Sequence, residues 1–307
     1  RNHLVIAMTN KALFEAMLGR FDEAKATVEK ALTSAKHYSM ESLTAGNLHT
    51  RSLLLFVEGS FLKAFEDQKE ALEAYLEDNH FAEALGCLSE IVAMTNYLGT
   101  HEMAEEVISS NAARLQNEIQ NVTRTWAISY SAHHLLHRTL SGELDIYDAV
   151  ESAENVLERA RESGILWLVA DVGRVLMAIH QMDGNHGKAA ENGMDLFPLL
   201  STHYCPLILP RFLISLAGSL LETDSGEDLA TVLESLKAYE KFLEKGPFGM
   251  EYCLLLKKQA QKEGVDPSPI SEKGKNIARL ILEAEKEEKV RDALMKLPAF
   301  LEFAAET

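Results

Sequence analysis

The sequence predicts an all-α protein, an α-solenoid of antiparallel helix pairs that ends in C-terminal capping helices. The first observation behind this prediction is a glycine that recurs at intervals of 40, 40, 43, 42 and 42 residues. The second is a pattern shared by four of the copies, with an aromatic residue or histidine two places after the glycine and an alanine five places after it. A period of this length indicates stacked supersecondary units. The glycines are Gly19, Gly59, Gly99, Gly184 and, in looser copies, Gly142 and Gly226.

Each copy predicts two helices around a turn. Gly19 ends the first helix, because a residue that is free to take positive φ closes a helix. The second helix carries an apolar stripe at helical spacing. Its members are Ala24, Val28, Ala31, Leu32 and Ala35. Ala24, Ala64 and Ala104 lack bulk where antiparallel helices approach most closely, so we expect these glycines and alanines to be structural.

The first unit resembles the tetratricopeptide repeat over nearly its full pattern. It reads Ala7-x-x-Asn10-x-Ala12, then Gly19-x-Phe21-x-x-Ala24-x-x-x-Val28-x-x-Ala31-Leu32. The resemblance implies a right-handed superhelix whose first helices line a concave groove. Repeats of that family usually have 34 residues. The longer period here, with the C-terminal phrase VRDALMKLP at 290–298, resembles the C-terminal solenoids of STAND-class signalling ATPases and LuxR-type regulators.

The pattern places about six helix pairs in residues 1–245. We expect them at 2–18 with 21–38, 40–58 with 61–78, 80–97 with 101–118, 122–140 with 144–163, 165–182 with 186–200, and 206–221 with 227–245. Helix 206–221 is the most hydrophobic, but Arg211 and two prolines interrupt it, and its 16 residues fall short of the roughly 20 that span a bilayer. It is expected to be a buried helix.

Residues 246–307 are expected to form C-terminal helices and a cap. A shorter helix is predicted at 249–262, and a linker at 264–274, because Asp266-Pro267-Ser268-Pro269 breaks helical patterns. The last helix is predicted from about 276 to 296. It includes the mixed charged run at 283–289, which is typical of a terminal cap that faces solvent.

The composition disfavours several classes of partner. Lys and Arg total 30 against 47 Asp and Glu, a net charge of −17, without a basic block. Nucleic acid and anionic membrane are therefore not expected partners. The three cysteines are far apart, which predicts neither a disulfide framework nor a thiolate zinc site and fits a cytoplasmic protein. The chain begins at Arg1 without a signal peptide, and we expect it to be part of a longer protein.

The resemblance also implies groove positions, which fall about nine, ten and thirteen residues before each turn glycine. They are occupied by Thr9 and Asn10, His49 and Thr50, Ser89 and Glu90, His133, and Asp171 and Arg174. Most are polar in helices that are otherwise apolar. The alternative is ordinary solvent-exposed surface, because any helix must show a polar face.

Two tryptophans occupy matching places near the start of consecutive first helices. Trp126 and Trp167 precede their turn glycines by 16 and 17 residues, so we expect them to lie beside each other. Tryptophan is enriched at binding hot spots, although packing between repeats is the alternative. Tyr130 and His133 follow Trp126 within two turns. The middle of the array is therefore the predicted recognition patch.

The sequence favours binding over catalysis. His133, His134 and His137 include an i,i+4 pair that could ligate zinc, but no acidic residue follows before Glu143. No nucleophile stands at a recognised spacing from a base. We predict a scaffold without cofactor or metal that binds a peptide or partner domain in its groove within a larger signalling protein. The alternative is a small-ligand sensor that controls an attached NTPase, cyclase or transcription regulator. A third hypothesis, an enzyme built on a helical scaffold, is supported only by the histidine cluster.

Overall fold

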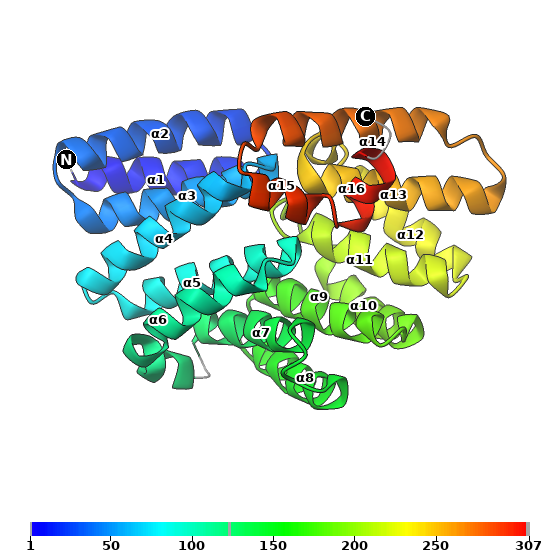
Figure 1. Ribbon diagram of the computed structural model, residues 1–307, viewed down its shortest axis with the longest axis horizontal. Coiled ribbons are helices and arrows are strands. Elements are labelled where there is room, and N and C mark those ends of the chain that lie inside the picture. Colours follow the sequence, from blue (N-terminus) through cyan, green and yellow to red (C-terminus); the bar gives the residue numbers. More distant parts are fainter. Residues whose placement is uncertain (1, 122–123, 305–307) are drawn as a thin grey trace.

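The computed structural model describes residues 2–121 and 124–304. Over these residues the chain forms sixteen α-helices and one short 3₁₀ helix, without a β-strand (Figure 1). The all-α solenoid is confirmed, although the start of the helix predicted from 122 lies outside the described residues. The pairs of the array are α1 (Asn2–Met17) with α2 (Phe21–His37), α3 (Glu41–Glu58) with α4 (Phe61–Glu77), α5 (Phe81–Leu98) with α6 (His101–Gln120), α7 (Thr125–Leu140) with α8 (Ile146–Glu162), α9 (Leu166–Met182) with α10 (His186–Leu200), and α11 (Leu209–Glu222) with α12 (Gly226–Lys237).

The repeat register is visible at the turn between α3 and α4. Gly59 takes φ 87°, and its N–H donates to the carbonyl of Phe56 at 3.1 Å. The helices then approach so closely that the Ser52 hydroxyl donates to the carbonyl of Ala64 at 2.7 Å, and Ala64 is fully buried. In the sixth pair the expected register is wrong by two residues. Asp224 takes the left-handed conformation there, and Gly226 begins α12 instead.

The C-terminal segment differs from its predicted outline. A 3₁₀ turn at Phe242–Glu244 leads into α13 (Gly246–Glu263), which is followed by α14 (Ser268–Ala284), α15 (Glu288–Leu294) and α16 (Pro298–Ala304). The connection after α13 spans only 264–267, because the predicted linker provides the first turn of α14, where proline is tolerated. The single helix predicted at 276–296 is broken near Glu285, which is buried.

The C-terminal helices pack back onto the N-terminal repeats. Figure 1 shows α14 and α2 along the same edge of the molecule, although they belong to opposite ends of the chain. The backbone N–H of Leu62, in the first turn of α4, donates to Oε2 of Glu285 at 3.2 Å. Ile281 of α14 packs against Gly59. Gly246 lies directly against the carbonyl of Val57 at the end of α3. The superhelix is therefore closed upon itself.

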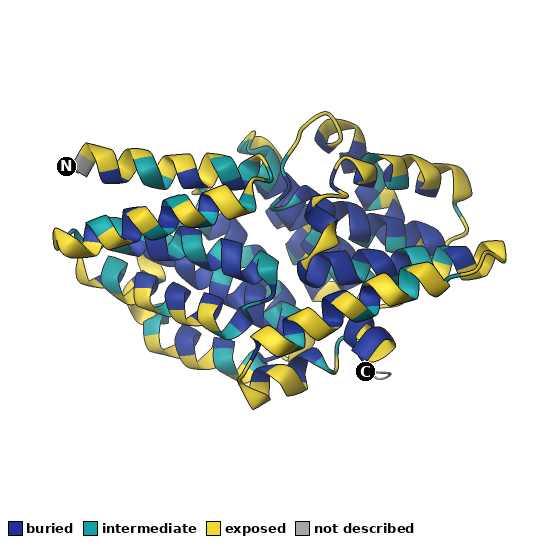
Figure 2. Ribbon diagram, turned by 90° about the horizontal axis from the view of Figure 1, so that it is seen from above, coloured by how far each residue is buried: buried dark blue, intermediate teal, exposed yellow. Residues whose placement is uncertain are grey.

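Closure fills the inside of the superhelix with side chains. Seen from above, buried residues gather on the inner sides of the helices and exposed residues on the outer sides (Figure 2). Phe56 lies 5.4 Å from Phe61, 5.6 Å from Tyr97 and 5.9 Å from Phe248 between ring centroids. These rings come from α3, α4, α5 and α13, so one aromatic cluster joins the two ends of the chain. No described helix is both long enough and apolar enough to cross a membrane.

Candidate functional site

A polar cluster forms where α7 and α9 face each other inside the superhelix. Nε2 of His133 lies 2.7 Å from Oδ2 of Asp171, and Nη2 of Arg174 donates to Oδ1 of Asp171 at 3.2 Å. Because a carboxylate only accepts, Nε2 carries the hydrogen of the first bond. Asp171 and Arg174 share a helix face, as their spacing predicts. His133 is 3% exposed and Asp171 8%.

Nearby charges decide the ionisation of this cluster. Burial alone would raise the pKa of Asp171, but the charge and hydrogen bond of His133, together with Arg174, hold it well below its usual range. Asp171 is therefore ionised. The pKa of Glu90 on α5 is raised by burial and then by the charge of Asp171, against the opposing effect of His133 and two arginines. Glu90 thus belongs to the same electrostatic cluster.

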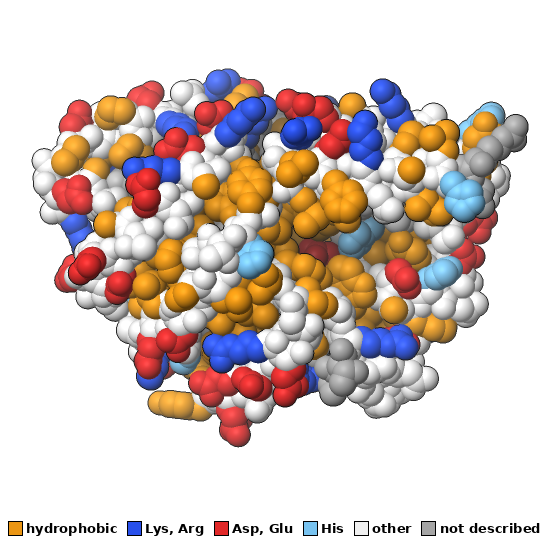
Figure 3. All heavy atoms as spheres, turned by 180° about the vertical axis from the view of Figure 1, so that it is seen from behind, with side chains coloured by type: hydrophobic (Ala, Val, Ile, Leu, Met, Phe, Trp, Pro, Cys, Tyr) orange, Lys and Arg blue, Asp and Glu red, His pale blue; other side chains and the backbone are white. Residues whose placement is uncertain are grey.

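The cluster opens on a pocket of about 500 Å³ between the first helices of successive repeats. The wall combines apolar residues with six that carry polar groups: Asn96, Tyr97, His133, Arg174, Gln181 and Arg211. Pro298 of α16 completes the wall. Figure 3 shows one face of the molecule on which hydrophobic side chains surround a hollow with acidic and histidine side chains in its depth.

The tryptophans lie side by side, as predicted. The ring centroids of Trp126 and Trp167 are 5.7 Å apart, with the planes tilted by 46°. Trp126 covers Gly86 of α5, where any Cβ would lie 2.9 Å from the indole. His49 of α3 meets Trp126 edge-on at 6.0 Å, and burial lowers the pKa of His49. Four first helices therefore contribute to this surface, which also packs the repeats together.

Of the nine predicted groove residues, only His133 and Arg174 line the pocket of about 500 Å³. Tyr130 and Asn10 lie furthest from the predicted arrangement. Tyr130 is 3% exposed and stacks at 5.2 Å on His134, four residues further along α7. Both line a separate cavity of about 360 Å³ between α6, α7 and α8. Asn10 is exposed on α1 and does not line the pocket. Its neighbour Thr9 instead hydrogen-bonds Asn47 of α3, at 3.1 Å.

The histidine motif is divided between two faces of α7. His133 turns inward to Asp171, whereas His137 faces α6 and lies 5.4 Å from His101 between ring centroids. Nε2 of His137 is 3.5 Å from a carboxylate oxygen of Glu105. In the described part of the chain, no three side chains of His, Cys, Asp or Glu are grouped to hold a metal ion.

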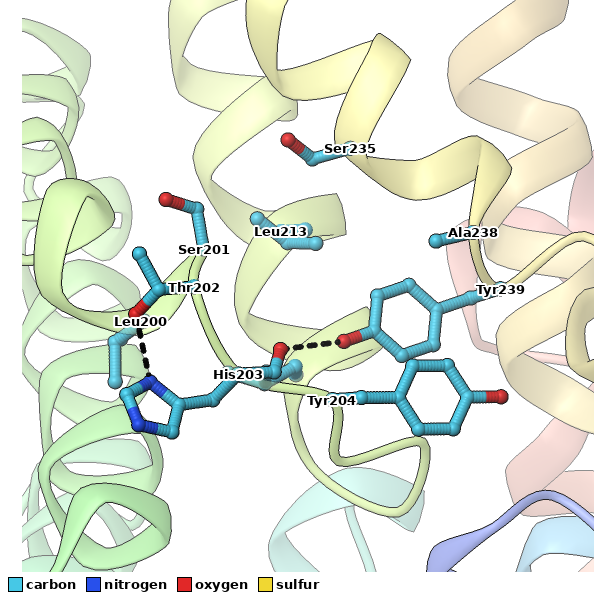
Figure 4. A pocket seen from close by; sticks show the side chains of 10 residues that line it. Leu200, Ser201, Thr202, His203, Tyr204, Leu213, Ser235, Ala238 and Tyr239 are labelled. Atoms are coloured by element: carbon cyan, nitrogen blue, oxygen red, sulfur yellow. Dashed lines mark hydrogen bonds between the residues drawn. The ribbon is translucent and has the colours of Figure 1, made fainter.

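A third cavity lies between the α10–α11 connection and α12. It has a volume of about 260 Å³, and three of its residues already pair their polar groups with one another (Figure 4). The Tyr239 hydroxyl donates to the carbonyl of His203 at 3.3 Å, and Nδ1 of His203 lies 2.9 Å from the Thr202 hydroxyl. Tyr204 stacks on Tyr239 at 5.1 Å. The candidate site is therefore the larger interior pocket.

Part of this pocket was not predicted from the sequence. Arg211 was expected only to interrupt an apolar helix, yet its guanidinium lies inside the superhelix, 4.8 Å from the ring of Phe248. A charged residue within a strongly apolar helix was the available signal, because a charge is seldom placed among apolar side chains without a specific environment. No local pattern predicts the contact of Phe248 with Arg211 or the place of Pro298 in the pocket wall, because both depend on closure.

The helix pairs and their turns define a tetratricopeptide-like solenoid, and the comparisons with known proteins agree. No protein-family model matches the chain, and no curated protein matches it. A Rap protein, solved in complex with Competence and Sporulation Factor, is similar with a TM-score of 0.66 at 13% identity. The alignment covers 99% of this chain and 84% of that one.

A second solved structure is a STAND protein with a tetratricopeptide repeat sensor from Pyrococcus horikoshii. It is similar with a TM-score of 0.51 at 14% identity, over 98% of this chain. The chain spans about half the length of that protein, 47%. Both likenesses show the fold, and they confirm the predicted resemblance to long-repeat solenoids of signalling proteins.

Proposed function

We propose that this chain is a non-catalytic binding segment of a larger regulatory protein and holds a short peptide, or an extended segment of a partner, in the interior pocket. The observation that carries the proposal is that His133 and Arg174, from adjacent repeats, line a cavity of about 500 Å³ with apolar walls, and that Asp171 hydrogen-bonds to both of them. A few polar groups within an apolar concavity are what recognition needs.

The polar groups suit a peptide backbone. Nδ2 of Asn96 donates to the backbone carbonyl of His133 at 2.8 Å, while its Oδ1 has no partner among the described residues. A buried acceptor without a donor is unfavourable by about 1–3 kcal/mol. A peptide N–H that reached this amide after a small side-chain rotation would satisfy it.

The comparisons add support at the level of the fold. The similarly folded Rap protein was solved with a bound factor, and the repeats of the STAND protein are described as a sensor. The likeness extends to architecture, and the identity of a partner for this chain rests on its own pocket.

A small-molecule sensor is the second candidate function. The pocket volume of about 500 Å³ falls in the range of roughly 300–1,000 Å³ that small-ligand sites occupy. In this alternative a ligand would change the coupling to an attached NTPase, cyclase or transcription regulator. Screening a peptide pool and a metabolite collection against the same protein separates the two functions.

The test compares pocket variants with an outer-face control. A pool of random pentapeptides is applied to the chain, and retained peptides are identified by mass spectrometry and titrated by calorimetry. Arg174→Ala is expected to weaken binding about tenfold to a hundredfold, because it removes a charged hydrogen-bonding group. Trp126→Ala tests the wider groove. Glu158→Ala, an exposed position on α8, should leave the affinity unchanged.

The proposal fails if no peptide is retained, or if Glu158→Ala weakens binding as much as both groove variants while circular dichroism shows all three folded. Binding by metabolites alone would favour the sensor.

A further inference from the structure

Arg211 stands out because its guanidinium carbon lies over three aromatic rings, while its N–H groups have no hydrogen-bond partner among the described residues. The guanidinium carbon lies 4.8 Å from the ring of Phe248, 5.7 Å from Phe56 and 6.0 Å from Tyr97. The guanidinium makes no hydrogen bond and no ion pair with any residue that the structure describes. Its five N–H donors all lie in the guanidinium plane.

This arrangement leaves the charge of Arg211 available to a ligand. Cation–π contacts contribute about 0.5–2 kcal/mol, but they do not satisfy N–H donors. Arg211 is half-buried and lines the pocket, so a ligand there can reach its side chain. Burial, and then repulsion from Arg174, lower the pKa of Arg211 to about 10, and Asp171 and Glu251 only partly offset this. The side chain remains charged at neutral pH.

The two arginines differ in how they are held. Arg174 is bound to Asp171, so its charge is matched within the protein. Arg211, on the next first helix, is held by aromatic rings and keeps its charge unmatched by any contacting carboxylate. Both line the same pocket. A single negative charge placed there would pair with Arg211 and relieve the repulsion between the two guanidiniums.

The remainder of the wall indicates what must accompany the negative charge. Leu136, Met182 and Pro298 line the pocket from three different helices. An apolar group attached to the anion would bury its surface against these side chains, at about 25 cal/mol per Å². A carboxylate has two oxygens that match the edge of a guanidinium. A dianion such as phosphate would bring a second charge close to Asp171.

We propose that Arg211, assisted by Arg174, is a carboxylate-binding subsite of this pocket, and that its ligand is a carboxylate joined to an apolar group. The inference rests on the proposed binding function. Two sources share this chemistry: the C-terminal residue of a peptide with an apolar side chain, and a small apolar carboxylic acid. Anchoring a C-terminus would also fix the direction in which a peptide lies in the groove.

The experiment compares acids with their neutral counterparts on the unmodified 307-residue chain. One arm uses random pentapeptides with free carboxyl termini and the same pool amidated. The other arm uses hexanoate and hexanamide. We expect the acid to bind at least tenfold more tightly than the amide in one arm. Selective peptide binding identifies a peptide C-terminus, and selective hexanoate binding without peptide binding identifies a small acid.

Two substitutions locate the effect. Arg211→Met keeps the apolar stem and removes the charge, and Arg211→Lys keeps the charge but loses the planar edge. Both should reduce the preference for acid over amide, and Arg161→Met, at an exposed arginine of α8, should leave it unchanged. Circular dichroism reports whether the variants fold, and the comparison on the unmodified chain does not depend on them.

Equal affinity for acid and amide peptides would overturn the subsite and leave the proposed function standing. A preference for acids that persists in folded Arg211→Met would place the carboxylate elsewhere and also overturn it. If neither pool and neither small molecule binds, the proposed peptide function and the subsite both fail.

Discussion

Gly246→Ala tests the closure of the superhelix at the point where its ends approach most closely. Gly246 begins α13 with φ 69°, and a Cβ at this position would lie 2.0 Å from the carbonyl oxygen of Val57 and 3.2 Å from its carbonyl carbon. Both obstacles are backbone atoms, so no rotamer change can relieve the contact. The substitution must therefore displace α13 from the end of α3.

The expected loss of stability has two parts. An alanine in the left-handed region costs about 1–2 kcal/mol. Ordinary contact begins near 3.4 Å, so α13 must shift by about 1 Å or more, and overpacking of this kind typically costs about 1–3 kcal/mol. The shift also pulls Phe248 from Phe56, a ring contact of 5.9 Å. We expect a total of about 2–5 kcal/mol.

A matched control separates the two parts. Gly264 has φ 70°, and a Cβ added to it would meet no other atom within 4 Å, so Gly264→Ala carries only the backbone term of about 1–2 kcal/mol. Urea unfolding followed by circular dichroism gives the midpoints of both variants and the parent. If the two variants lose the same stability, α13 is not packed against Val57 as described and the closure argument is wrong.

Three further predictions concern packing, capping and charge, all measured by urea unfolding. Ala64→Leu should lose about 1–3 kcal/mol because the helices of the second pair must separate, whereas Ala113→Leu at an exposed position should be neutral. Glu285→Ala should lose about 0.5–2 kcal/mol with the cap of α4, and Glu283→Ala, close by in the sequence and exposed, should lose less. Glu90→Gln should stabilise the protein at pH 7, because burial raises the pKa of Glu90 and disfavours its charged form in the folded state. This gain should vanish below about pH 4, where the carboxyl is protonated in both states; a gain that persists at low pH would exclude this cause.

The repeat register was predictable because each helix pair carries its own pattern of glycine and alanine within a short stretch of sequence. Gly59 and Ala64 recur with their neighbours at fixed spacing, and the same spacing placed Asp171 and Arg174 on one helix face. Their proximity to His133 followed from stacking consecutive pairs. Register alone does not fix how far each helix is rotated about its own axis. The prediction therefore missed that Tyr130 lies on the flank of α7 beside His134.

Closure was not predictable from the same signals. Leu62 and Glu285 are separated by 223 residues, and whether they meet depends on small rotations summed over every repeat. The C-terminal charged run looked like a solvent-facing cap, yet Glu285 turns inward from it and is 4% exposed. Arg211 became interpretable only when Phe56 and Phe248, from opposite ends of the chain, were seen to enclose it.

Residues that line the pocket also depend on the C-terminal helices that close the superhelix, and this dependence links binding to closure. Arg211 rests on Phe248 of α13, and Pro298 of α16 completes the wall. A ligand that contacts either residue binds the closed arrangement better than an opened one, and such linkage is reciprocal. Gly246→Ala should therefore weaken the selected ligand severalfold, although Gly246 does not line the pocket.

Calorimetric titration of Gly246→Ala and of the Gly264→Ala control measures this linkage directly. The control lies at the far end of α13, where closure does not depend on it, so its affinity should equal that of the parent. By mass action, a ligand that binds only the closed state must also stabilise it against urea in proportion to occupancy. Equal affinities in the two variants would show that the pocket forms without closure, and Pro298 of α16 would then have no part in binding.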